Sequence, residues 1–129
     1  MKPERPLRVV LVDDDADVLL MLEVMLTKRN LDVVGLASCG ADAEKVTKAI
    51  GPDIAIVDYM MPGMDGFETA ARIKAACPDC VVVIYSALPD LAATALARAD
   101  VDHFVAKGDF FELDAMLTKM RATGRAAPG

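Results

Sequence analysis

Four aspartates crowd into five positions directly after an apolar run near the amino terminus. The run LRVVLV (7–12) is followed by Asp13, Asp14, Asp15 and Asp17. Neighbouring carboxylates repel one another, and crowding disfavours their ionised form. A bound divalent cation reverses this effect and keeps the carboxylates charged. The cluster therefore indicates a site for a hard, oxygen-liganded ion such as Mg²⁺, which commonly binds phosphate as well.

Three other apolar runs also end at a polar residue that could do chemistry. Asp58 closes DIAIVD, Ser86 follows VVVIY and Lys107 closes HFVAK. A carboxylate, a hydroxyl and a lysine beside a metal ion suit phosphoryl transfer, in which catalysis consists mainly of positioning and charge stabilisation. Aspartate can itself be the nucleophile and form an aspartyl phosphate.

The elements that must position these residues alternate along the chain. Short, β-branched, nearly continuous apolar runs are typical of strands buried on both faces, and amphipathic segments separate them. Such alternation with short links predicts an α/β fold with a parallel sheet and helices on both faces. The expected strands are 7–12, 32–37, 53–58, 81–85 and 103–107, and the expected helices are 16–29, 41–50, 65–76, 90–99 and 109–122.

Local signals mark where some of these helices begin. Asp65 with Glu68, and Asp109 with Glu112, have the spacing of a capping box. In a doubly wound sheet the carboxyl ends of the strands meet at one edge, where ligands bind. We therefore expect the polar residues that end the apolar runs to lie close together at that edge.

Composition limits the classes of partner. The chain has 129 residues, a net charge of −6 and a pI of about 4.6, which argues against direct binding of nucleic acid or of anionic membranes. No apolar run approaches the roughly 20 residues of a membrane span, and the first one is too short for a signal peptide. The sequence thus predicts a cytoplasmic domain.

The three cysteines and the single histidine point to no separate chemistry. An odd cysteine count without an export signal argues against a disulfide framework. The C-x-x-C of Cys77 and Cys80 closes a helical segment, whereas a redox motif would open one. With His103 as the only histidine, a zinc site is disfavoured.

Competing interpretations of the acidic cluster fit less well. A calcium-binding EF-hand loop starting at Asp13 needs glycine at its sixth position and glutamate at its twelfth, and valine stands at both. A phosphatase of the haloacid dehalogenase type needs Thr or Val soon after D-x-D, whereas Ala16 and Asp17 follow Asp15. Asp15 and Asp17 are expected to cap the first helix, and we do not count them as metal ligands.

The segment VDYMMPGMDGFE (57–68) resembles the phosphoacceptor strand and following loop of response-regulator receiver domains, the phospho-accepting modules of two-component signalling. The resemblance covers residues 7–122, which we expect to be one receiver domain with flexible ends at 1–6 and 123–129. It implies a flavodoxin-like sheet of five parallel strands in the order 2-1-3-4-5. The short segment after residue 122 suggests a stand-alone regulator.

The resemblance implies roles for the acidic residues. Asp58 would accept the phosphoryl group, and Asp13 and Asp14 would be the acidic pair that holds Mg²⁺. Asp58 and the backbone carbonyl of Met60 would be further metal ligands.

It also implies roles at the ends of the later strands. Ser86 would hydrogen-bond the phosphoryl oxygens, Lys107 would pair with the phosphate, and Phe104 takes the aromatic switch position. One departure is Gly108, because the family often has proline after this lysine.

The implied function is a phosphorylation switch, and the protein would catalyse only its own phosphorylation and slow dephosphorylation. A histidine kinase or histidine phosphotransfer protein would supply the phosphoryl group. The face formed by segments 90–99, 103–107 and 109–122 would then change and regulate a downstream protein, and the same face would be the one available for a homodimer.

Two alternatives stay open from the residues. One is a small Mg²⁺-dependent phosphohydrolase, which would need a general acid or base beside Asp58 and an inserted substrate cap that is not evident. The other is a degenerate, unphosphorylated interaction module, against which the complete set of polar residues argues.

Overall fold

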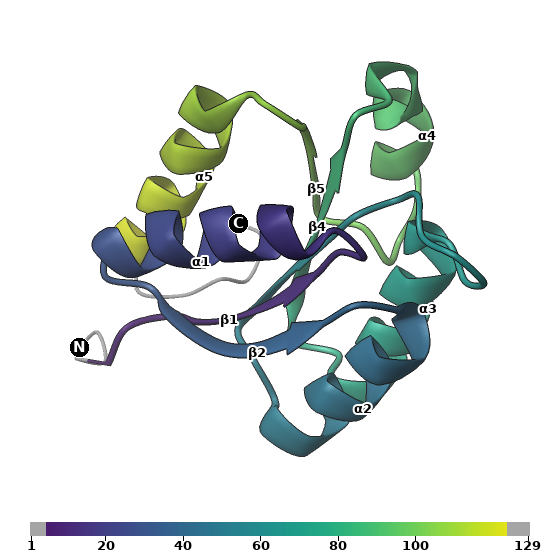
Figure 1. Ribbon diagram of the computed structural model, residues 1–129, viewed down its shortest axis with the longest axis horizontal. Coiled ribbons are helices and arrows are strands. Elements are labelled where there is room, and N and C mark those ends of the chain that lie inside the picture. The colour runs from purple at the N-terminus through teal and green to yellow at the C-terminus, as the bar shows by residue number, and fades with distance from the viewer. Residues whose placement is uncertain (1–4, 124–129) are drawn as a thin grey trace.

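The computed structural model describes residues 5–123, which form a five-stranded parallel sheet with helices on both faces (Figure 1). The strand order is β2-β1-β3-β4-β5, which confirms the predicted fold class and strand order. The strands are β1 (Arg8–Val12), β2 (Asp32–Ala37), β3 (Ile54–Val57), β4 (Val81–Ser86) and β5 (His103–Ala106).

The helices pack in two layers. α1 and α5 cover one face of the sheet, and α2, α3 and α4 lie on the other (Figure 1). The predicted caps are present, because the Asp65 carboxylate accepts the N–H of Glu68 at 2.9 Å and the Asp109 carboxylate accepts that of Glu112 at 3.0 Å. The helices are α1 (Ala16–Lys28), α2 (Gly40–Ile50), α3 (Gly66–Ala76), α4 (Ala92–Leu96) and α5 (Phe110–Thr123), with a 3₁₀ turn at Pro89–Leu91.

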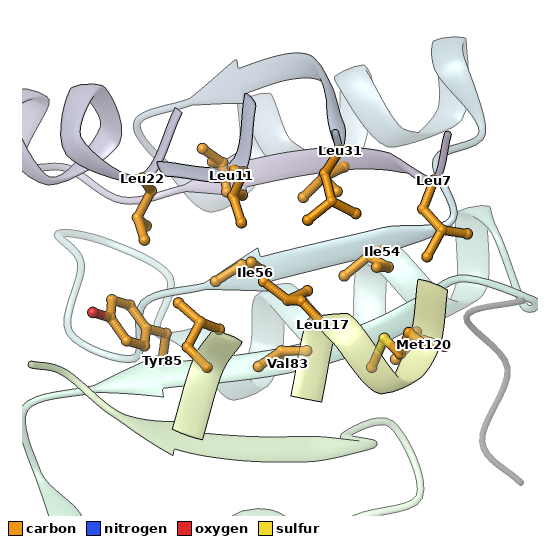
Figure 2. Packing of buried hydrophobic residues seen from close by; sticks show 14 of the residues in the cluster. Leu7, Leu11, Leu22, Leu31, Ile54, Ile56, Val83, Tyr85, Leu117 and Met120 are labelled. Carbon is orange, nitrogen blue, oxygen red and sulfur yellow. The ribbon is translucent and has the colours of Figure 1, made fainter. Parts of the chain in front are cut away.

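The sheet separates two hydrophobic clusters, which explains why its central strands are apolar without interruption. Along β1, Val9 and Leu11 face the layer of α1 and α5, whereas Val10 and Val12 face the layer of α2 and α3. Figure 2 shows the first cluster, in which Leu117 of α5 packs over the side chains of β3 and β4. Burial on both faces holds the strand ends, and hence the site, in place.

The helix predicted over 90–99 is shorter in the structure. Pro89 begins a 3₁₀ turn, and α4 then spans only the five residues Ala92–Leu96. The end follows from tightening of the last turn, since the Arg98 N–H bonds to the Ala95 carbonyl at 3.1 Å in an i→i−3 pattern. Ala95 is buried in this helix while Leu96 is 56% exposed, so α4 makes few apolar contacts with the sheet.

The predicted flexible ends fall mostly on residues 1–4 and 124–129, which lie outside the described residues. Of the remainder, Arg5 pairs with Asp53 at 2.8 Å, and α5 extends to Thr123. Within residues 5–123, none of the helices has the length and apolar character needed to cross a membrane.

Candidate functional site

Polar residues from four strands meet at the carboxyl edge of the sheet. Asp13 follows β1, Asp58 follows β3, Ser86 closes β4 and Lys107 follows β5. The Lys107 ammonium lies 2.8 Å from Oδ2 of Asp13 and 3.2 Å from Oδ1 of Asp58. The structure thus places a lysine between two carboxylates that are 45 residues apart in the chain.

The backbone of the sheet holds these carboxylates at the edge. The Asp58 N–H donates to the Val12 carbonyl at 2.9 Å, and the Asp13 N–H donates to the Ala37 carbonyl at 3.0 Å. Each bond continues a strand ladder one residue beyond the apolar run. Asp13 and Asp58 are therefore positioned by the register of β1 with its two neighbours, and both are buried.

Three carboxylates form a cluster that could hold a cation. One oxygen from each of Asp13, Asp14 and Asp58 lies within 4.8 Å of the others. Asp14 is exposed and the other two are buried, so the cluster is open on one side. Asp15 stands outside it and caps α1, because its carboxylate accepts the Asp17 N–H at 2.9 Å. An all-oxygen donor set fits Mg²⁺.

The charges around Asp58 pull its pKa in opposite directions. Burial, followed by the negative charge of Asp13, raises the pKa of the Asp58 carboxyl. Lys107 and the backbone N–H of Met60 oppose this rise without cancelling it. For Lys107 itself, burial lowers the pKa, but the hydrogen bond to Asp13 and the charges of both carboxylates outweigh burial and raise it. A charged lysine thus faces a carboxylate cluster that it only partly neutralises.

Ser86 and Phe104 lie on the face of the sheet that α3 and α4 cover. Ser86 is fully buried, and its hydroxyl oxygen accepts the N–H of Leu88 at 3.1 Å, which shapes the turn after β4. Phe104 pairs in register with Ile84, two residues before Ser86, and packs half-buried against the second cluster. The predicted switch residues are therefore neighbours on adjacent strands.

The loop after β3 passes close to helix α3 at a glycine. The Gly66 N–H donates to the Tyr59 carbonyl at 2.8 Å, and a Cβ atom at Gly66 would lie 2.6 Å from the Asp58 carbonyl oxygen. Only glycine permits this approach. Met60 is 60% exposed beside a hollow that Tyr59, Met61, Pro62 and Asp65 also line.

Sequence reasoning missed one contact at this edge. The N–H of Gly108, the residue after Lys107, donates to the hydroxyl oxygen of Tyr85 at 3.3 Å. Tyr85, which lies between Ile84 and Ser86 in β4, is buried. The sequence predicted it only as part of an apolar strand. The available signal was its hydroxyl, which is the only polar side-chain group in the run VVVIY.

Comparisons with known proteins agree with this fold. The family model described as response regulator receiver domain matches residues 9–120. A chemotaxis protein CheY from Thermotoga maritima is 33% identical over 101 residues, covering 78% of this chain and 84% of that protein. The solved structure of the response regulator TrrA from the same organism, in complex with Mg(2+)-BeF, has a TM-score of 0.79 and 26% identity, and the match covers 88% of this chain and 97% of that one.

Other relatives are much longer than this chain. A protein-glutamate methylesterase/protein-glutamine glutaminase from Halalkalibacterium halodurans is 34% identical over 99 residues. The match covers 76% of this chain but only 29% of that protein. The similarity therefore concerns one part of the methylesterase.

Proposed function

Because the chain belongs to the response regulator receiver domain family, we propose that it accepts a phosphoryl group on Asp58 and acts as a signalling switch. The observation that supports this most is the Lys107 ammonium between the Asp13 and Asp58 carboxylates at the carboxyl edge of the sheet. Phosphorylation and Mg²⁺ are typical of this family, and the proposal assigns both to this edge.

The acidic cluster would hold Mg²⁺. Asp13, Asp14 and Asp58 would supply carboxylate oxygens, and Met60 would add its backbone carbonyl. When bound, the ion supplies positive charge to the oxygens of the phosphoryl group and keeps the carboxylates ionised. The open side of the cluster at Asp14 leaves room for such a ligand.

The transfer step uses a phosphohistidine of a kinase or phosphotransfer protein as donor. A carboxylate oxygen of Asp58 attacks the phosphorus, the new O–P bond forms, and the N–P bond breaks with its electron pair passing to the imidazole. The imidazole takes up a proton from solvent if it leaves as the anion. Lys107 stabilises the negative charge on the phosphoryl oxygens throughout, which is the main source of catalysis in such transfers.

The output would be a shift between two states of the surface. In the phosphorylated state the Ser86 hydroxyl would leave the Leu88 N–H for a phosphoryl oxygen, and Phe104 would move into the space released. The face of α4, β5 and α5 would then bind a downstream protein or a second copy of the chain. Because α4 is short and its Leu96 is exposed, such a change would require little free energy. We place these events in the cytoplasm, where the phosphohistidine donor would act.

The proposal is tested by intact mass after incubation with acetyl phosphate and Mg²⁺. The parent and Asp53→Asn should gain one labile phosphoryl group, and Asp58→Asn should gain none. Asp53 is a matched control because it is another aspartate paired with a cation, although it is half-buried where Asp58 is buried. A folded parent that binds Mg²⁺ yet forms no adduct, or an equal adduct on Asp58→Asn, would contradict the proposal.

A further inference from the structure

We infer that Tyr85 is a positioning residue for Lys107, acting through the N–H of Gly108. The inference rests on the proposed function, because it concerns the lysine that would stabilise the transferred phosphoryl group. Neither the acidic cluster nor the aromatic switch includes this tyrosine. Its role follows from the backbone geometry of the turn that carries Lys107.

The turn after β5 has the pattern of a type II turn. The Asp109 N–H donates to the Ala106 carbonyl at 3.0 Å, which closes four residues with Lys107 second and Gly108 third. Gly108 has a φ of +91°, close to the value of about +80° that a type II turn requires at its third position. Lys107 thus stands at the corner of a tight turn, directly after the last residue of β5.

The orientation of the peptide between Lys107 and Gly108 decides the turn type. In a type I turn the ψ of the second residue is about −30°, whereas in a type II turn it is about +120°, so the central peptide is flipped between the two. The hydrogen bond that closes either turn does not involve the N–H of this peptide. In this chain the Tyr85 hydroxyl accepts it at 3.3 Å and so favours one orientation.

Tyr85 is well placed to hold that peptide rigidly. Its ring is 98% buried in the cluster between the sheet and α5, with the hydroxyl directed away from Leu117 and Met120 (Figure 2). The next residue, Ser86, accepts the Lys107 N–H at 2.7 Å through its carbonyl. Two adjacent residues of β4 therefore bind the backbone N–H groups of Lys107 and Gly108, one on each side of the Lys107 side chain.

This rigidity matters because a lysine has a long, flexible stem. The Lys107 ammonium must reach Asp13 at 2.8 Å and Asp58 at 3.2 Å together, and only its backbone can restrict where the stem starts. A misplacement of about 1 Å at a reacting centre can cost about a hundredfold in rate. Proline, which the family often has after this lysine, cannot adopt a φ of +91° and has no N–H for Tyr85. The pair of Tyr85 and Gly108 is thus this chain's own way of fixing the lysine.

The first test is the rate of phosphorylation by acetyl phosphate at saturating Mg²⁺. Tyr85→Phe should react about threefold to tenfold more slowly than the parent, the effect of one lost hydrogen bond, with unchanged affinity for Mg²⁺. Exchange of the Gly108 amide hydrogen, followed by NMR, should become faster in the same variant. Tyr59→Phe is the matched control, because the Tyr59 hydroxyl has no hydrogen bond within residues 5–123.

The second test separates positioning from a general structural effect. In a Lys107→Met background, adding Tyr85→Phe should cause no further loss of rate, since there is no lysine left to position. An unchanged rate in Tyr85→Phe, or an equal fold loss with and without Lys107, would overturn the inference while leaving the proposed function intact. A parent that takes up no phosphoryl group would overturn both.

Discussion

The two edges of the sheet each hold a lysine among polar groups, yet they differ in charge balance. At the amino edge, the Lys74 ammonium lies 2.7 Å from a carboxylate oxygen of Asp102 and 2.7 Å from the Cys80 carbonyl. The same Asp102 oxygen accepts the Val82 N–H at 2.8 Å. One cation meets one anion, and backbone groups satisfy both. The charges of this pair are therefore balanced within the fold.

At the carboxyl edge the positive and negative charges are not balanced. Lys107 is shared between Asp13 and Asp58, and Asp14 adds a third carboxylate that lies within 4.8 Å of theirs. The edge therefore carries more negative than positive charge, and a further cation would stabilise it. A half-buried pair of lysine and aspartate is thus no sign of function by itself, whereas an unbalanced group of charges at the ligand-binding edge of such a sheet is.

The largest expected contrast between the edges comes from removing each lysine in turn. Lys107→Met should slow phosphorylation about a hundredfold, because the charge on the phosphoryl oxygens loses its fixed partner. Lys74→Met should leave the rate unchanged and lower the free energy of unfolding by about 2 kcal/mol, because it leaves the Asp102 carboxylate unpaired. Acetyl phosphate kinetics and urea unfolding with Mg²⁺ present measure the two effects. A rate loss in Lys74→Met comparable to that in Lys107→Met would remove the distinction.

A smaller effect is expected from a substitution at Gly66, which lies against the backbone of Asp58. Gly66→Ala places a methyl group 2.6 Å from the Asp58 carbonyl oxygen and from the Tyr59 Cα, so the loop must shift. We expect a loss of about 2 kcal/mol in the free energy of unfolding, together with slower phosphorylation of the molecules that remain folded. Urea unfolding and adduct formation followed by mass test this. Parent-like values for both would mean that the loop moves freely.

The smallest expected effects concern pH and have opposite signs at the two edges. The pKa of the Asp58 carboxyl is raised, first by burial and then by the charge of Asp13. Without metal, the contribution of this carboxyl to the free energy of unfolding is therefore fully present below pH 3.8 and is lost as the pH rises through the raised pKa. The pKa of Asp53 is lowered because Arg5 and the Arg8 N–H outweigh burial, so its contribution is present above 3.8 and is lost as pH falls through the lowered pKa.

Neutralising each aspartate should therefore shift stability in opposite directions. At pH 7 with a chelator, Asp58→Asn should gain about 1 kcal/mol in the free energy of unfolding, and Asp53→Asn should lose about 1 kcal/mol. Both differences should shrink toward pH 3, where the parent carboxyls are protonated in the unfolded chain. Urea unfolding at the two pH values checks this, and shifts of the same sign would contradict the assignment.

The fold could be predicted from the sequence because its signals are local. Uninterrupted apolar runs indicated the five strands, and the capping residues Asp65 and Asp109 marked the starts of two helices. The meeting of Asp13, Asp58 and Lys107 followed from the rule that parallel strands end at one edge. The end of α4 at Leu96 was missed, since an alanine-rich segment shows no strong period from which to place its end.

Contacts that depend on register and turn type could not be predicted. Lys74 and Asp102 are 28 residues apart and look like ordinary surface charges in the sequence. The link from Tyr85 to Gly108 exists only because the turn after β5 takes the form in which its central N–H points toward the Tyr85 hydroxyl. Neither the apolar pattern nor the spacing of residues carries this information.

The lysine of the site, Lys107, follows the last strand of the sheet in the sequence, whereas the first carboxylate, that of Asp13, follows the first strand. During synthesis Asp13 leaves the ribosome early. Lys107 leaves it late, because it lies near the carboxyl end of residues 9–120, the span that matches the family. Until β5 has joined the sheet, the carboxylates have no lysine between them. Under the proposed function, a chain that lacks β5 and Lys107 would therefore be a poor phosphoacceptor.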